Sequence, residues 1–235
     1  MEHLEPVVDD DQDYQDWDQD SDFEEVEEDD ALDGSFGQDD LNNADETVIL
    51  GKVTKLLNKI RSFSKFCRKS TRIADAVSKL TGEDGLNYKR FLVDFHVRWN
   101  TTYLMLQRFL EMKNIVVSLT CPVDVLQFDF SDTQIEKLKK FKFTQSEINL
   151  AEILCTVLKP FFTATKMLSG KDYPTLASSK VVEIILFNHF SNLKQDPSSR
   201  VTQALATMLY DSFEKYFDTK VSLEQKNTCL VFNSF

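Results

Sequence analysis

The side chains of this sequence best suited to a chemical task are the basic ones of residues 52–69. This stretch contains no Asp or Glu, and its seven positive charges are Lys52, Lys55, Lys59, Arg61, Lys65, Arg68 and Lys69. Clustered Lys and Arg without interspersed acids can neutralise phosphates, so the stretch is typical of a surface that contacts a nucleic-acid backbone. The solvated outer face of an ordinary helix would have the same composition, and the residues alone leave both interpretations open.

Residues of the kinds that enzymes use for catalysis or metal binding are scattered along the chain. The six glycines form no phosphate-binding loop, and the three histidines have no triad-like motif around them. The four cysteines, Cys67, Cys121, Cys155 and Cys229, lie far apart without a CxxC pair. This spacing predicts free thiols in a reducing compartment. We therefore expect no catalytic side chain, no metal ligand and no cofactor.

Apolar residues at three- and four-residue steps place the basic stretch on one face of a helix that begins near Thr47. Further helices are predicted over residues 71–80, 102–118, 132–141, 146–169, 175–193 and 199–217, with Lys137, Lys139 and Lys140 on the outer face of the one over 132–141. Pro160 is expected to kink the helix that contains it. The fold class is therefore mainly α, a multi-helix domain.

The connection before the third helix contains the best strand candidate. Residues 91–97, FLVDFHV, form a short run rich in β-formers. Asn100 or Thr101 is expected to cap the helix that follows, and Ser131 the helix over 132–141. We predict at most one short strand.

Charge divides the chain into two unlike parts. Residues 1–46 contain 21 acidic and no basic side chains, so the other 189 residues hold 18 acidic and all 27 basic ones, a net charge of +9. We predict three regions: an acidic disordered arm over 1–46, a helical domain over 47–219, and an irregular C-terminal tail over 220–235.

Three interpretations of the acidic arm remain open. It can be a solvated tail or linker, because its charges repel one another and its apolar residues are few. It can also mimic nucleic acid and compete for the basic domain, or act as an acidic-aromatic activation segment through Tyr14, Trp17, Phe23 and Phe36.

The N-terminus lacks the basic and apolar regions of a signal peptide, and no run of about 18 apolar residues occurs. We expect a soluble intracellular protein that does not bind membranes.

The stretch from Arg98 to Arg108, RWNTTYLMLQR, follows the strand candidate directly and resembles a motif of the hAT superfamily (hobo, Activator, Tam3) of DNA transposases. The flanking segments are similar too: residues 51–70 resemble the family's basic helix, and residues 158–176 resemble its helices joined by an "LS…PTL" element. The resemblance covers roughly residues 47–217. It implies the helical insertion domain of a ribonuclease-H-like transposase.

The family binds divalent metal through two Asp before the RW motif and one Glu well after it, and the resemblance gives none of the three a counterpart in this chain. Asp94 lies too close to the motif to be assigned a catalytic role. The resemblance implies instead that Trp99 stacks on a DNA base and that Arg98 neutralises a neighbouring phosphate.

The resemblance therefore leads to a DNA-binding remnant of a hAT transposase, nuclear and not catalytically competent alone. A helical protein-interaction module is the alternative, as is a fragment of an active transposase from an incomplete gene model. The partners expected are DNA and either a second copy of the chain or a full-length transposase.

Overall fold

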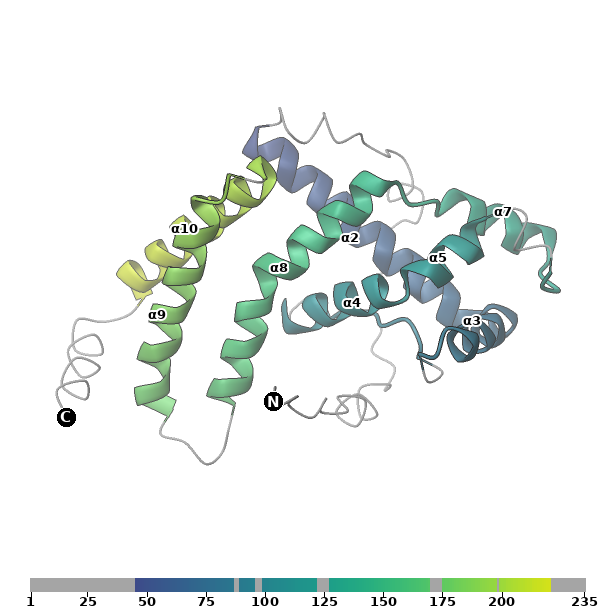
Figure 1. Ribbon diagram of the computed structural model, residues 1–235, viewed down its shortest axis with the longest axis horizontal. Coiled ribbons are helices and arrows are strands. Elements are labelled where there is room, and N and C mark those ends of the chain that lie inside the picture. The colour runs from purple at the N-terminus through teal and green to yellow at the C-terminus, as the bar shows by residue number, and fades with distance from the viewer. Residues whose placement is uncertain are drawn as a thin grey trace, which may run out of the picture.

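A computed structural model describes residues 45–86, 89–95, 99–121, 127–169, 175–197 and 199–220. The acidic arm up to residue 44 and the tail over 221–235 lie outside these residues, and so does Arg98. Within the described residues, eight helices and no strand occur, which confirms the mainly α class (Figure 1).

The helices follow the predicted positions closely. Their bounds are α2 (Glu46–Lys69), α3 (Thr71–Glu83), α4 (Trp99–Glu111), α5 (Lys113–Thr120), α7 (Asp132–Lys140), α8 (Gln145–Leu168), α9 (Thr175–Lys194) and α10 (Arg200–Lys220). Ser131 caps α7 as predicted, in a reciprocal capping box with Gln134. Thr144 and Glu147 form a second capping box at the start of α8. This helix continues through Pro160.

The predicted helix over 102–118 is two helices. α4 and α5 are separated by Met112, whose backbone (φ −97°, ψ 20°) leaves the helical region. Met112 is fully buried, and the apolar residues of α5 pack with α3 and α7. An apolar repeat continues across a one-residue break, so periodicity alone does not reveal the redirection.

The predicted strand is wrong over residues 91–95, and residues 96–98 lie outside the described part. Contacts made by side chains hold this segment in place, and among the described residues no ladder of backbone hydrogen bonds to another strand does so. Phe91 is buried with its ring centroid 5.1 Å from that of Phe63. The Phe95 amide donates a hydrogen bond to Thr101 Oγ1 (2.8 Å). An apolar run of β-formers does not make a strand where no neighbouring strand pairs with it.

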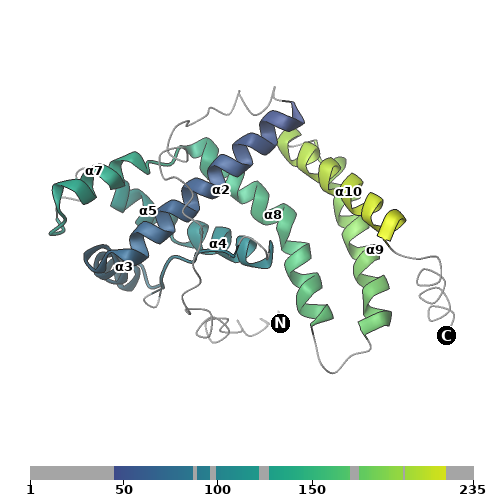
Figure 2. The same ribbon diagram turned by 180° about the vertical axis from the view of Figure 1, so that it is seen from behind.

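The core has two parts that α8 connects. In the larger one, Phe63 of α2 makes edge-on contacts with Phe91, Phe141 and Phe143. The smaller one lies between the C-terminal half of α8 and helices α9 and α10, around Phe190. Accordingly α9 and α10 lie at one end of the molecule, and α3, α5 and α7 lie at the other. The front and back views both show this (Figures 1 and 2).

A buried ion pair joins α2 to the start of α8. Lys59 Nζ lies 2.8 Å from Glu147 Oε1 and 3.0 Å from Oε2, and it also donates to the Lys142 carbonyl (2.9 Å). The two residues are only 5% and 2% exposed. Glu147 Oε2 accepts a further hydrogen bond from the Thr144 amide (2.7 Å). The pair thus links the capping box of α8 to the middle of α2.

By length and composition, α8 is the one helix in the described residues that could cross a membrane. It packs against α4 and α9, and its first turn carries the buried Glu147. A single helix of this kind is weak evidence of a membrane span.

Removing one partner of the buried ion pair should destabilise the fold strongly. We expect Glu147→Ala to lower the free energy of unfolding by about 3–5 kcal/mol, because Lys59 is left buried and unpaired. Urea denaturation followed by circular dichroism measures this. Lys55→Met, an exposed position one turn earlier on α2, should change the stability by less than about 0.5 kcal/mol. Equal effects of the two substitutions would show that the ion pair does not hold α2 to α8.

Candidate nucleic-acid interface

The structure divides the seven basic residues of the predicted site into two groups. Lys55, Arg68 and Lys69 are exposed on α2, and Lys52 and Lys65 are partly exposed. Lys59 and Arg61 do not lie on the solvated face, and the prediction is wrong for these two positions. Lys59 points into the core, where its ammonium group is held by Glu147.

Arg61 forms a two-pronged ion pair with Asp94. Its Nε lies 2.6 Å from Oδ1 and its Nη2 lies 2.7 Å from Oδ2, while Nη1 donates to Asn58 Oδ1 (2.8 Å). The Asp94 side chain is fully buried and that of Arg61 is 14% exposed. Such fork-shaped pairs fix geometry as well as charge. The guanidinium therefore binds the protein itself and is not presented to a phosphate.

The Arg61–Asp94 pair also holds the start of α4. Thr102 Oγ1 donates to Asp94 Oδ2 (2.7 Å), and the Thr101 hydroxyl exchanges hydrogen bonds with the backbone of Phe95. α4 begins at Trp99, so the expected capping role of Asn100 or Thr101 is wrong. Thr101 and Thr102 instead join the first turn of α4 to Asp94 and Phe95, the residues described before 96–98. We call this the junction clamp: Arg61, Asp94, Thr101 and Thr102.

The junction clamp holds the first turn of α4 beside the basic helix. Arg98 itself lies outside the described residues, and for Trp99 the structure gives only its place as the first residue of α4. Lys65 and Arg68 follow Arg61 by four and seven residues, so they lie on the same side of α2 as the clamp. Residues of α2 and α4 that are distant in the sequence thus meet at one place.

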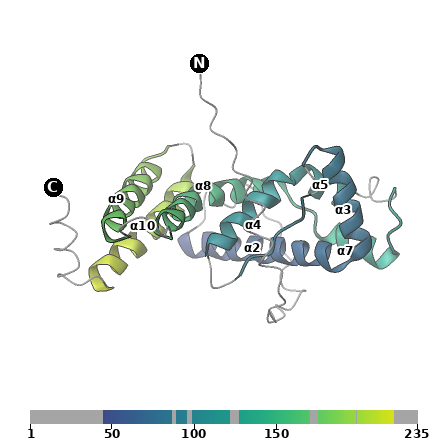
Figure 3. The same cartoon turned by 90° about the horizontal axis from the view of Figure 1, so that it is seen from below.

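Three lysines of α7 lie outside the predicted site but close to the basic helix. Lys137 Nζ lies 5.1 Å from the ring centroid of Phe66 on α2, and Gln134 Nε2 donates to Ser70 Oγ (2.8 Å) at the end of α2. Lys139 and Lys140 are exposed on the same helix. These contacts place α7 beside the C-terminal end of α2, where the ribbon in Figure 3 also draws it, so its lysines add to the basic residues of α2. The charges were visible in the sequence, but no periodicity predicts that α7 packs against this end of α2.

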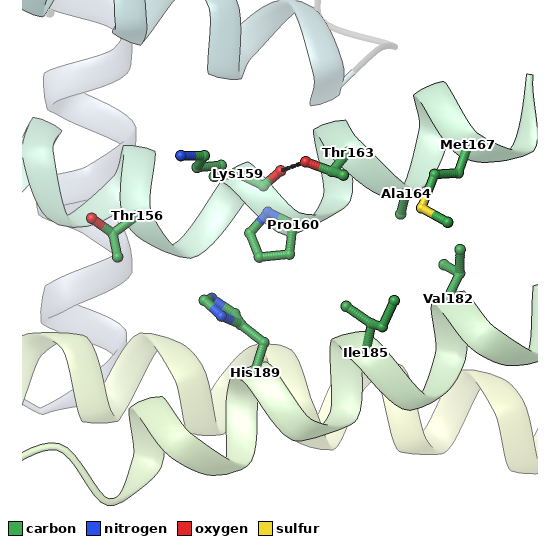
Figure 4. A pocket seen from close by; sticks show the side chains of 9 residues that line it. All are labelled: Thr156, Lys159, Pro160, Thr163, Ala164, Met167, Val182, Ile185 and His189. Carbon is green, nitrogen blue, oxygen red and sulfur yellow. Dashed lines mark hydrogen bonds between the residues drawn. The ribbon is translucent and has the colours of Figure 1, made fainter. Parts of the chain in front are cut away.

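A separate pocket of about 470 Å³ lies between α8 and α9 (Figure 4). Its lining is mainly apolar, with Pro160, Ala164 and Met167 on α8 and Val182 and Ile185 on α9. His189 reaches into the same pocket from α9 (Figure 4).

His189 lies across this pocket from the proline of α8. Pro160 has no amide hydrogen, so the carbonyl of Thr156 lacks its helical donor. Burial lowers the pKa of His189, and an interaction with the Thr156 backbone opposes this by raising it. Among the described residues, His189 Nε2 is buried without a hydrogen-bond partner.

The three described cysteines, Cys67, Cys121 and Cys155, are free, as predicted, and Cys229 lies outside the described residues. Burial raises the pKa of the Cys155 thiol to about 12 and that of Cys67 further still. A thiol with a raised pKa is a poor nucleophile. Among the residues described by the structure, no group of three or more His, Cys, Asp or Glu side chains could hold a metal ion.

Comparison with known families confirms the resemblance seen in the sequence. The model of the ZBED1 RNase-like helical domain matches residues 41–157, about half of the chain. The match spans α2 to α7 and the first half of α8, and so includes the basic helix and the junction clamp. No curated protein and no solved structure matches the chain. Residues 41–157 thus match the ZBED1 RNase-like helical domain family, which derives from hAT transposases.

Proposed function

We propose that this chain is a DNA-binding module of hAT-transposase origin that performs no catalysis on its own. The observation that carries the proposal is the junction clamp, because it fixes the start of α4 to the same side of α2 as Lys65 and Arg68. Exposed basic residues of α2 would then bind phosphates next to the place where Arg98 and Trp99 act.

The two parts of this interface would have different tasks. Lysines and arginines on α2 neutralise phosphates and position the protein without reading sequence. An aromatic ring at the start of α4 can stack on an unpaired base, which is worth about 1–3 kcal/mol. The buried Asp94 keeps these two parts in a fixed relation, so its role is structural positioning and not metal binding. We propose no cofactor for this activity and a nuclear location for the protein.

A second candidate function is a helical protein-interaction module. α9 carries apolar residues on two sides: Val182, Leu186 and Phe190 are buried, whereas Val181, Ile184 and Ile185 are each 46–47% exposed. A helix that is apolar all round normally has both sides covered. Self-association, or association with a full-length transposase, would cover this face.

The basic residues of α2 should control DNA affinity and its salt dependence. We expect Lys55→Gln, Arg68→Gln and Lys69→Gln together to reduce the slope of log Kd against log salt by about 2–3, because each phosphate contact contributes about 0.9. Fluorescence anisotropy with a duplex that carries an unpaired base measures this at several salt concentrations.

The matched control replaces three exposed lysines away from α2, Lys113, Lys159 and Lys166, with Gln. It makes the same change in net charge and should leave the slope unchanged. No DNA binding by the unsubstituted chain at low salt, or equal slopes for the two triple variants, would contradict the proposal.

The junction clamp predicts that a buried carboxylate affects DNA binding from a distance. We expect Asp94→Asn to weaken binding to the unpaired-base duplex by at least about 5-fold, equivalent to about 1 kcal/mol, because the start of α4 loses its hold on Arg61. Glu147→Gln also removes a buried carboxylate, but it lies in the capping box of α8 and should change affinity less than 2-fold where both variants remain folded. Trp99→Ala should weaken the same duplex. If Trp99→Ala alters only stability, the interaction-module function is favoured instead.

The exposed face of α9 should matter only for the second candidate. If that face is an interface, Ile184→Glu with Ile185→Glu will convert a dimer to a monomer in sedimentation-velocity measurements. Asn188→Glu, an exposed position one turn further along α9, serves as the control. A monomer before substitution would argue against self-association through this face.

A further inference from the structure

The basic surface extends beyond the residues needed for the proposed DNA contact. Phe66 and Lys69 lie one turn apart on α2, and Lys137 of α7 sits over the Phe66 ring. Lys139 and Lys140 extend the positive charge along α7. We call this surface the α2–α7 basic face: Lys69, Lys137, Lys139 and Lys140.

Few acids share this face. α2 has no Asp or Glu after Glu46, and the next acid along the chain is Asp75 of α3. On α7 the acids are Asp132 and Glu136, against three lysines, and Arg72 at the start of α3 lies 3.6 Å from the exposed Asp129. The positive charges outnumber the negative ones, so the face attracts a polyanion.

The same chain supplies a polyanion of matching charge. Residues 1–44 contain 19 acidic and no basic side chains, and they join the domain directly at the N-terminus of α2. No other segment of comparable length in the sequence is free of basic residues.

The attachment point lets this segment reach the basic face. α2 has 24 residues and is therefore about 36 Å long at 1.5 Å per residue, so the face lies about that far from the attachment point. The composition of residues 1–44 predicts disorder, and a disordered chain of 44 residues has a root-mean-square span of about 35–40 Å, which charge repulsion extends further. The tether holds the acids at an effective concentration in the millimolar range, so weak electrostatic contacts suffice for docking.

We propose that residues 1–44 dock on the α2–α7 basic face and compete with DNA for it. This regulation rests on the proposed DNA-binding function, whereas the docking itself does not. The contact is electrostatic and consists of several interchangeable ion contacts, with no fixed pairing of residues. It weakens as salt rises, because salt screens charges on the surface. The arm therefore suppresses non-specific DNA binding, and a specific DNA element with additional contacts displaces it.

The first experiment tests the docking without DNA. An arm-neutral full chain is made by replacing the 19 acidic residues of 1–44 with Asn and Gln. A fluorescein-labelled peptide of residues 1–44 is titrated into it, and anisotropy is read at low and high salt. We expect saturable binding at low salt that weakens at least tenfold when Lys69, Lys137 and Lys140 are changed to Glu. The control is the change of Lys113, Lys159 and Lys166 to Glu, and it should retain the binding.

The second experiment tests the competition. We expect the arm-neutral full chain to bind duplex DNA at least tenfold more tightly than the unsubstituted chain at low salt, with the difference vanishing at high salt. The docking is overturned if the peptide does not bind, or if the two triple-lysine variants lose the same amount of peptide affinity. Peptide binding with equal DNA affinities of the two full chains overturns the competition. Peptide binding with no DNA binding by either chain supports the docking and overturns the DNA-binding function instead.

Discussion

The arrangement of this domain depends on the buried ion pair between Lys59 and Glu147. The pair places the middle of α2 against the first turn of α8, and Phe143 and the Lys142 carbonyl complete the site around the ammonium group. A charge this deeply buried requires well-placed partners. Lys59 has them, and it thereby fixes which side of α2 faces the core and which side carries Lys55, Arg68 and Lys69 outwards. The inward orientation of Lys59 therefore determines which side of α2 carries the basic surface.

A second buried carboxylate has a comparable role at the other side of α2. Asp94 binds Arg61 and Thr102 together, and this holds the chain on both sides of residues 96–98. The two ion pairs use basic residues of the same helix for cohesion, whereas Lys55, Arg68 and Lys69 are exposed. A division of this kind allows one helix to serve as core element and as polar surface. It also makes the proposed DNA contact dependent on core integrity.

The helices could be predicted from the sequence because their apolar residues recur at helical spacing and because Ser131 starts a local capping motif. The failures share a physical cause. The break at Met112, the unpaired segment over 91–95 and the inward turn of Lys59 are all decided by contacts with residues distant in the sequence. Local patterns do not contain those contacts. Of the candidate site, the charge of the basic helix and the RWNTT motif were visible, but the contribution of α7 was not.

By itself the sequence determined the mainly α class, the positions of most helices, the separation of acidic arm and basic domain, and the relation to hAT transposases. These properties follow from composition, periodicity and a local motif. Only the tertiary structure decided which positive charges are exposed, that Asp94 is an anchor of α4, and that α7 extends the face of α2. The physical reason is that the identity of a lysine does not decide whether its side chain is exposed or buried. Burial requires a partner such as Glu147 within hydrogen-bonding distance, and only folding brings that partner close.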